Sequence, residues 1–401
     1  MTNQDNTPKG LRPHIVLVGK RNAGKSSLIN ALTEQNLSIV SSIPGTTTDP
    51  VEKAYELQPF GPVVFIDTAG LDDSGELGEL RISKTQKAIN RADIIVVVIN
   101  EVLDEKLEAI IKNTQDKKLL YVINKIDLLS EVQLEKIKSH PELAENKPIL
   151  CSALSRYGIE PLKERLNLEL SGLEKIPALM ADLVESSDTV VLVIPIDKEA
   201  PQGRLILPQV QVIRELLDLD TVVVVVKERE LHYALKHGIK NKPKIVVTDS
   251  QAFLKVSADV PDDIGLTSFS ILLARQKGDL RQYVEGIKAV NKLKTGDKVL
   301  ISELCSHRPI SEDIGRVKIP RWLKQHTGLN LDFEVNAGQD FPEDLSPYSL
   351  IIQCGGCMVN RPLIKHRIQQ ATTQQVPITN YGVVIAYMHG ILERAIRPFN
   401  L

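Results

Sequence analysis

The sequence of 401 residues lacks several features that would each point to a particular class of protein. It has no basic excess, because 49 Lys and Arg residues face 51 Asp and Glu residues, and this balance argues against an overall surface for nucleic acid or anionic lipid. No apolar run approaches the roughly 18 residues of a membrane-spanning helix, so we expect no membrane span. The four cysteines are too few for a disulfide framework, which leaves metal binding or catalysis for any that cluster.

The N-terminal residues 1–9 also lack the order of basic and then apolar residues that is typical of a signal peptide. We therefore expect a cytoplasmic protein. The length predicts two to three domains. Pro177 marks a boundary, because a proline interrupts helical continuation and the pattern of the chain changes after it.

A phosphate-binding motif follows the first predicted strand. Residues 14–19 form a short apolar, β-branched run that ends in glycine, which predicts a buried parallel strand. The residues from Gly19 to Ser26 match the pattern G-x-x-x-x-G-K-S/T and lead into a predicted helix. Glycines let backbone N–H groups surround phosphate oxygens, Lys25 neutralises their charge, and Ser26 can bind Mg²⁺. The residues expected to contact the phosphates are Gly19, Asn22, Ala23, Gly24, Lys25, Ser26 and Ser27.

Two further motifs supply groups for the metal ion and the terminal phosphate. An apolar strand runs into Asp67-Thr-Ala-Gly70, where the carboxylate can hold Mg²⁺ and the Gly70 N–H can sense the γ-phosphate. Residues 44–49 lie between this motif and the phosphate loop, and their Thr46 and Thr47 hydroxyls can close on the metal as GTPase switches do. The predicted Mg²⁺ ligands are Ser26, Thr47 and Asp67, and the predicted catalytic groups here are Lys25, Thr47 and Gly70.

The tetrapeptide Asn124-Lys125-Ile-Asp127 determines which base is expected. A carboxylate at Asp127 can accept hydrogen bonds from guanine N1–H and N2–H, each worth roughly 1.5–3 kcal/mol, whereas adenine offers no such pair of donors. Ser152 and Ala153 follow a short apolar run, and their backbone N–H groups can meet guanine O6. We therefore predict GTP rather than ATP, with Asn124, Lys125, Asp127, Ser152 and Ala153 around the base.

On these motifs, residues 11–170 resemble a GTPase of the translation-factor class that acts in tRNA modification and ribosome assembly. The resemblance implies a doubly wound parallel sheet, and it implies that Asn22 helps to bind K⁺. The position of the catalytic glutamine of Ras-like switches holds Leu71, so another group must activate water. Similar GTPases draw a glutamate from the acidic loop that follows, and Glu79 is our choice; a solvated acidic switch is the alternative.

The middle segment, residues 177–260, carries no catalytic motif. Its strand-like and helix-like runs alternate, which predicts a small parallel sheet. The strand-like runs are 189–194, 221–226 and 244–247, and the helix-like runs are 208–218 and 228–237. The run 221–226 contains five valines and would favour aggregation on an exposed edge unless it is covered or paired. We therefore predict a dimerisation domain and a homodimer.

Three of the four cysteines follow two predicted strands of the C-terminal segment. The strand 298–302 is followed by Cys305, and the strand 349–353 runs into Cys354-Gly-Gly-Cys357. Because the carboxyl ends of parallel strands share one edge of a sheet, we expect these sulfur atoms to converge. The paired glycines permit the tight turn that would bring two thiolates to one metal centre.

A fourth ligand is less well defined, since His307 and Glu303 are both candidates. Three thiolates with one imidazole suit structural Zn²⁺, whereas three cysteines with an uncertain fourth ligand also suit an iron–sulfur cluster. Redox-active or structural thiols are a third interpretation. The residues themselves leave these alternatives open.

The order of parts, a GTPase followed by a cysteine-free segment and a C-x-H and C-x-x-C pair, resembles the maturation GTPases of FeFe-hydrogenases across the whole chain. The resemblance implies a 4Fe-4S cluster on Cys305, Cys354 and Cys357, and a scaffold or carrier for the di-iron precursor of the hydrogenase active site. It implies radical-SAM maturases and apo-FeFe-hydrogenase as partners. Members often carry His directly before C-x-x-C, where this chain has Gln353, so His307 stays a candidate ligand.

This resemblance predicts three α/β domains: a P-loop GTPase domain at 1–172, a dimerisation domain at 177–260 and a cluster-binding domain at 261–401. The main alternative is a tRNA-modification or ribosome-assembly GTPase with a zinc-stabilised C-terminal domain, which the near-neutral charge disfavours. A redox enzyme that uses Cys354 and Cys357 is a further alternative.

Two expectations concern the end of the chain. A helix after Cys357 carries basic residues that we expect to form a solvated face: Arg361, Lys365, His366 and Arg367. Residues 381–396 predict one final helix with a packing role.

Overall fold

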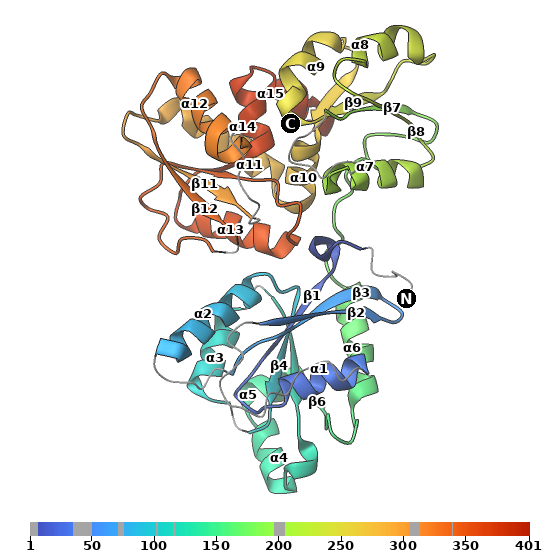
Figure 1. The fold of residues 1–401 in the computed structure, drawn as a ribbon. Helices are drawn as coiled ribbons and strands as arrows, with labels where there is room; N and C mark the ends of the chain where they lie inside the picture. Colours follow the sequence, from blue (N-terminus) through green and yellow to red (C-terminus); the bar gives the residue numbers. More distant parts are fainter. Residues whose placement is uncertain are drawn as a thin grey trace. The chain divides into compact units, whose positions relative to one another are not determined.

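The computed structural model describes residues 7–34, 50–70, 76–101, 103–114, 117–195, 205–304, 313–338 and 340–401, without the side chains of 76–79. The chain divides into two compact units, Met1–Lys175 and Ile176–Leu401. Each unit has its own β-sheet structure, covered by helices (Figure 1).

The first unit contains a six-stranded sheet in the order β2-β3-β1-β4-β5-β6. Its strands are β1 (His14–Val18), β2 (Val51–Leu57), β3 (Gly61–Asp67), β4 (Ile94–Ile99), β5 (Lys118–Ile123) and β6 (Ile149–Leu150). Neighbouring strands are parallel except for β2, which pairs antiparallel with β3. The helices are α1 (Lys25–Thr33), α2 (Glu76–Asn90), α3 (Glu105–Lys112), α4 (Glu131–Lys138), α5 (Pro141–Asn146) and α6 (Ile159–Ser171). The predicted doubly wound sheet is confirmed, with β2 as an unpredicted edge strand.

Alternating side chains along β1 explain why helices cover both faces of this sheet. Ile15 and Leu17 pack in one apolar cluster with residues of α1 and α6. Val16 and Val18 pack in a second cluster with residues of α2 and α3. All residues of β1 and β4 are buried, as is typical of central parallel strands. Because these neighbours run parallel, the loops after them meet at one edge of the sheet.

The second unit contains two four-stranded sheets, and every strand pair in them is parallel. The first has the order β10-β9-β7-β8, with β7 (Thr189–Val193), β8 (Val222–Val226), β9 (Ile245–Thr248) and β10 (Gly265–Ser268). The second has the order β12-β11-β13-β14, with β11 (Lys298–Glu303), β12 (Asp332–Ala337), β13 (Leu350–Gln353) and β14 (Ile378–Asn380). Strand β10 thus extends the first of these sheets beyond residue 260, where the sequence analysis ends the middle segment.

Helix α10 (Phe269–Lys277) connects the cores of the two sheets. Its Ile271 and Ala274 pack in a cluster that contains residues of β11 and β13, whereas Leu272 and Leu273 pack in a cluster with residues of β7 and β9. The other helices of the unit are α7 (Leu207–Asp218), α8 (Leu231–Tyr233), α9 (Phe253–Asp259), α11 (Leu280–Ile287), α12 (Ile319–Thr327), α13 (Arg361–Thr373), α14 (Tyr381–Met388) and α15 (Leu392–Ile396).

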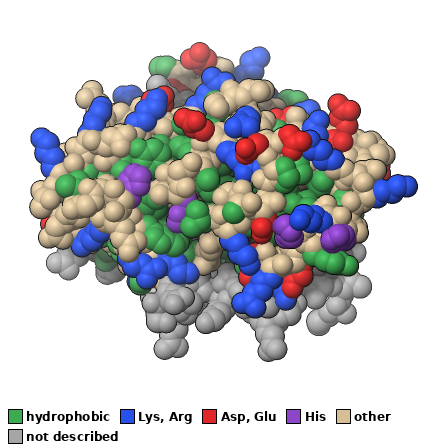
Figure 2. Space-filling model, turned by 90° about the horizontal axis from the view of Figure 1, so that it is seen from above, with side chains coloured by type: hydrophobic (Ala, Val, Ile, Leu, Met, Phe, Trp, Pro, Cys, Tyr) green, Lys and Arg blue, Asp and Glu red, His purple; other side chains and the backbone are tan. Residues whose placement is uncertain are grey.

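The predicted helix 381–396 is two helices, α14 and α15. The chain turns between them at Gly390, whose φ of +71° lies in the left-handed region that a right-handed helix does not contain. Throughout the described ranges, no helix is long and apolar enough to cross a membrane. On the face drawn in Figure 2, Lys and Arg side chains are interspersed with Asp and Glu side chains.

Candidate functional site

The phosphate loop lies between β1 and α1, at the edge where the parallel strands end. Gly24 precedes α1 with a φ of +90°, and a Cβ atom there would lie 2.3 Å from Asn124 Nδ2, so the position requires glycine. The Lys25 side chain is only 6% exposed. Its ammonium donates to the carbonyl oxygens of Gly19 at 2.9 Å and Lys20 at 2.8 Å, and therefore lies inside the loop that would surround a phosphate.

Two oxygen-bearing side chains that could hold Mg²⁺ lie beside this loop. Ser26, in the first turn of α1, donates its hydroxyl to Asp67 Oδ2 at the end of β3. Burial raises the pKa of Asp67, while the Ser26 hydrogen bond and the nearby Lys25 ammonium oppose this rise. The second carboxylate oxygen, Asp67 Oδ1, is buried and accepts no hydrogen bond within the described structure. A buried carboxylate oxygen without a donor, next to a hydroxyl, fits a hard divalent cation.

Asn124 braces the loops that form the nucleotide site. Its Nδ2 donates to Ala23 O at 2.9 Å, and its Oδ1 accepts from Ala153 N at 3.2 Å. Asn124 is fully buried, so it fixes the phosphate loop against the two base loops. The motif predicts only a contact with the base for this residue, and its bracing role depends on tertiary contacts that the sequence pattern does not show.

The residues predicted around the base have unequal surroundings. Asp127 lies in a 3₁₀ turn and is exposed, so its carboxylate can meet a guanine. The N–H of Ser152 donates to Tyr157 O at 3.0 Å, and the Ala153 N–H is held by Asn124, so both groups are engaged within the protein. Burial raises the pKa of the neighbouring Cys151 thiol to about 12, which is typical of a structural cysteine.

Gly70 packs closely against the phosphate loop. A Cβ atom at Gly70 would lie 2.6 Å from the backbone nitrogen of Arg21, so no side chain fits there. Several predicted site residues lie outside the described part of the chain: Thr46, Thr47, Cys305, His307 and the side chain of Glu79, whose backbone belongs to α2. Leu71, which stands in place of a catalytic glutamine, also lies outside it.

The second group of candidates lies at the carboxyl ends of β11 and β13. These strands are parallel neighbours, with Ser302 opposite Gln353, so the chain leaves both strands at the same edge, as expected. The Leu304 N–H donates to Cys354 Sγ at 3.2 Å. Since Cys305 directly follows Leu304, the two cysteine-bearing segments are adjacent where the described chain stops.

A buried lysine supports the C-x-x-C loop. Lys277, the last residue of α10, is 1% exposed and donates to the carbonyl oxygens of Gly356 at 3.0 Å, Cys357 at 3.0 Å and Val359 at 2.8 Å. Burial lowers the pKa of Lys277 to about 8, although Cys357 and Cys354 oppose this shift. Burial also raises the pKa of Cys354 to about 11 and raises that of Cys357. Pattern analysis gives no sign that Lys277 belongs to this site.

Two charged residues beside the cysteines differ from expectation. Arg367 on α13 is fully buried rather than solvated, because its guanidinium donates to Ser302 Oγ at 2.8 Å and to Gly338 O at 2.8 Å. Glu303, considered as a fourth ligand, pairs with Arg316 at 2.8 Å and is 2% exposed. Within the described ranges, no group of three or more His, Cys, Asp or Glu residues is arranged to hold a metal ion. Cys305 and His307 are outside those ranges.

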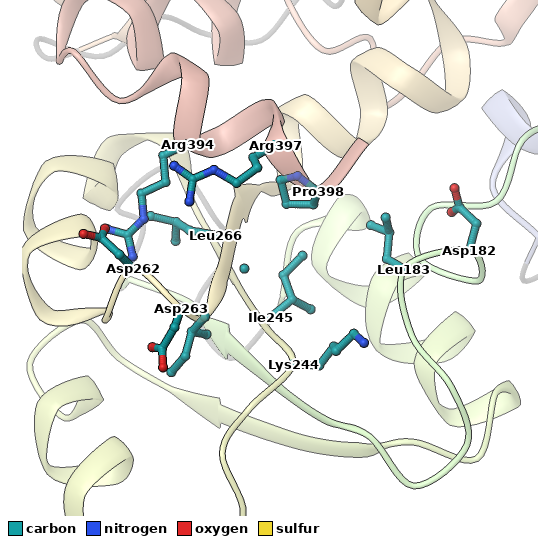
Figure 3. Close-up of a pocket in the computed structure, with 12 residues that line it drawn as sticks. Asp182, Leu183, Lys244, Ile245, Asp262, Asp263, Leu266, Arg394, Arg397 and Pro398 are labelled. Carbon is teal, nitrogen blue, oxygen red and sulfur yellow. The ribbon is translucent and has the colours of Figure 1, made fainter. Parts of the chain in front are cut away.

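A cavity of about 390 Å³ lies elsewhere in the second unit, at the start of β9 and β10 (Figure 3). Lys244, Asp263 and Arg397 are among the residues that line it. None of the predicted site residues does. The cavity lies at the amino ends of the strands, opposite the edge where parallel sheets bind ligands.

Family models match three parts of the chain. Residues 14–125 match a model described as a 50S ribosome-binding GTPase. Residues 179–278 match the hydrogen maturase F dimerization domain, and residues 281–398 match the hydrogen maturase F tetramerization domain. The first unit is therefore a GTPase domain, and the second carries two oligomerization domains.

Similar curated proteins match a part of the chain. The tRNA modification GTPase MnmE of Clostridioides difficile is 37% identical over 155 residues, which cover 38% of this chain and 33% of that protein. The enzyme of the same name from Acetivibrio thermocellus is 38% identical over 154 residues, with the same shares of 38% and 33%. The chain thus matches about a third of the length of these relatives.

Solved structures of GTPases are also similar. Aquifex aeolicus Era bound to GDP·AlF4⁻ is 22% identical with a TM-score of 0.34, and the match covers 53% of this chain and 93% of that one. The G domain of the T. maritima FeoB iron transporter is 23% identical with a TM-score of 0.30, and that match covers 40% and 99%.

Proposed function

Because the chain belongs to the hydrogen maturase F family, we propose that it is a GTP-hydrolysing scaffold that binds a 4Fe-4S cluster and assembles or delivers the di-iron precursor of the FeFe-hydrogenase active site. The observation that carries this proposal is the meeting of two cysteine-bearing strand ends, where Leu304 donates to Cys354 Sγ. In this proposal the partners are radical-SAM maturases and apo-FeFe-hydrogenase, and the protein works in the cytoplasm.

The nucleotide chemistry follows from the geometry of the first unit. Lys25 neutralises the β- and γ-phosphates, and the loop N–H groups and the start of α1 add positive potential. Ser26 and Asp67 would hold Mg²⁺, with Thr47 as a further ligand, and the ion would neutralise negative charge on the phosphates. Asp127 selects guanine.

Water activation needs a group other than the glutamine that Leu71 replaces. We assign it to Glu79, at the start of α2, and we assign K⁺ binding to Asn22. Asn22 is exposed in the phosphate loop with a φ of +60°, so its side chain can reach a cation on the nucleotide side. A bound K⁺ would offset phosphate charge during hydrolysis.

The residues present fit a thiolate-bound cluster. Cys354 and Cys357 lie on one tight turn, Cys305 follows the strand end beside it, and the buried cations Lys277 and Arg367 lie close enough to favour an anionic group. Three cysteines would hold three irons of the cluster, with His307 as a candidate for the fourth. When bound, the cluster supplies an iron that no cysteine holds, and the precursor could attach there in place of His307.

Anaerobic reconstitution with iron and sulfide tests the proposal. We expect about four irons and four sulfides per chain for the wild type, with broad visible absorption, and loss of both in Cys354→Ser. Cys151→Ser is the matched control. Cys151 is buried beside the base loop, so we expect this variant to keep the cluster. Stoichiometric zinc without iron would instead favour the alternative, a zinc-stabilised GTPase acting on RNA.

We propose that β8 forms the dimer interface. Val222 N donates to Asp188 O and Ile194 N donates to Val226 O, so the even-numbered residues of β8 pair with β7. In a parallel ladder the residues between them, Val223 and Val225, then direct their N–H and C=O groups to the open side. Among the described strands, none pairs with that side. A second copy can pair there and cover the valines.

Val225→Lys should therefore weaken dimerisation. Val225 is 49% exposed on this edge, and a lysine there opposes strand pairing between copies, so we expect the dimer dissociation constant to rise by about tenfold or more. Val132→Lys is the control, because Val132 is 80% exposed on α4 of the GTPase domain. Sedimentation over a concentration series measures the constant. Equal dimerisation by both variants would assign the interface to another surface.

A further inference from the structure

Lys277 combines burial with an unusual set of partners. Its ammonium has three donors, and the carbonyl oxygens of Gly356, Cys357 and Val359 accept from it at 2.8–3.0 Å. The residue is 1% exposed, and no carboxylate in the described ranges forms an ion pair with it. Lys277 lies at the C-terminus of α10, where the negative end of the helix dipole offsets part of its positive charge. An anionic group bound nearby would further stabilise the charged form of this buried ammonium.

The carbonyl contacts also orient the opposite side of the loop. The Gly356 carbonyl shares a trans peptide unit with the Cys357 N–H, and the Cys357 carbonyl shares one with the Met358 N–H. In a planar trans peptide the C=O and N–H bonds point in opposite directions. By holding both carbonyls, Lys277 fixes the directions of these two N–H groups.

The sulfurs lie on the other side of this turn. The Leu304 N–H donates to Cys354 Sγ at 3.2 Å. The backbone N–H groups of Gly356 and Met358 lie near the sulfurs and lower the pKa of Cys354 and of Cys357, respectively, against the rise that burial causes. The loop therefore presents its carbonyls to Lys277, while its N–H groups lie on the side of the sulfurs. Gly356 makes this turn possible with a φ of +61° in a place where a Cβ would lie 2.6 Å from Ile364 Cδ1.

We propose that Lys277 is a positioning residue for the cysteine-bound cluster: by holding three carbonyls it fixes the shape of the C-x-x-C turn and the directions of its N–H groups, and it places a buried positive charge behind that turn. This inference rests on the proposed function, since it takes the bound group to be an iron–sulfur cluster. Hydrogen bonds to the sulfurs and nearby positive charge both stabilise the reduced cluster, which carries one more negative charge. Lys277 thus raises the reduction potential of the cluster and slows its loss.

Lys277→Met tests the inference, because methionine has a similar length but neither charge nor donors. With the reconstituted full-length protein, we expect normal iron and sulfide content but a more negative midpoint potential in a titration followed by EPR. We also expect a several-fold faster loss of iron to a chelator. The matched control is Arg275→Met. Arg275 is a cation on the same helix, but it pairs with Asp182 and not with the loop.

Each outcome bears on one proposal. A wild type that binds no iron and sulfide overturns the proposed function. A wild type that binds the cluster, with the potential and iron loss of Lys277→Met unchanged, overturns the role of Lys277 alone. If Lys277→Met fails to fold by circular dichroism, Lys277→Gln and Lys277→Arg are compared: a potential more negative in the glutamine variant than in the arginine variant supports the role, and equal potentials overturn it.

Discussion

Lys25→Ala is expected to lower kcat for GTP hydrolysis by about 10²–10³-fold, the cost typical of removing one preorganised donor to a developing negative charge. Lys25 is 6% exposed, and its ammonium already lies within the phosphate loop, where it holds Gly19 O and Lys20 O. On a nucleotide the same ammonium neutralises phosphate charge, so its loss affects both the shape of the loop and the electrostatics of the transition state. Phosphate release at saturating GTP measures the effect.

Lys20→Ala is the matched control for this prediction. Lys20 belongs to the same loop, but its ammonium lies 3.4 Å from both Glu101 and Asp104 and is therefore committed to a surface ion-pair network. Because such pairs contribute little, we expect this variant to keep most of the activity. A folded Lys25→Ala that hydrolyses GTP as fast as Lys20→Ala would contradict the assignment of the phosphate site.

The GTPase fold was largely predictable because its motifs lie directly at strand ends. The apolar runs at β1 and β4 and the last four residues of β5 are buried and stand out in the sequence. Strand β2 was missed because Val51–Leu57 is an edge strand with three exposed and three partly exposed residues, so charged and apolar side chains both occur in it. An edge strand of this kind carries little of the apolar signal that predicts a strand.

The second unit shows a different limit. Strand β10 has only four residues, Gly265–Ser268, and it belongs to its sheet because it pairs with β9. Pairing between separate segments is a tertiary property, and the composition of such a short segment does not encode its partner. The proline and the acidic residues that follow residue 260 therefore predict a domain boundary there, although the sheet continues beyond it.

Buried charge was the hardest feature to predict at the cysteine site. Lys and Arg are mostly exposed in proteins, so Lys277 and Arg367 read as surface residues. Their burial depends on acceptors far along the chain: Lys277 contacts carbonyls of the C-x-x-C loop, and Arg367 contacts Ser302 and Gly338. The cysteine pattern indicated where a metal could bind, but the buried cations beside it come from helices whose sequences carry no such signal.

Asp127→Asn is expected to reverse the base preference of the GTPase. The carboxylate accepts from guanine N1–H and N2–H, and at 1.5–3 kcal/mol for each charge-assisted bond its loss should weaken GTP binding by roughly 10²–10⁴-fold. An asparagine presents one acceptor and one donor, so its NH₂ group faces the guanine amino group. Xanthine carries a carbonyl oxygen at that position, which accepts from the NH₂ group, and xanthosine triphosphate should therefore bind the variant better than GTP does.

The decisive quantity is the ratio of the two dissociation constants, measured by competition against a fluorescent nucleotide. Glu131→Gln is the control, because Glu131 is an exposed carboxylate in the first turn of α4, four residues along the chain, and should leave the ratio unchanged. Since Asp127 is exposed and lies in a short 3₁₀ turn, its substitution should not disturb the core. A ratio in Asp127→Asn equal to that of the wild type would show that another group selects the base, and the loop of Ser152 and Ala153 would then be the place to search.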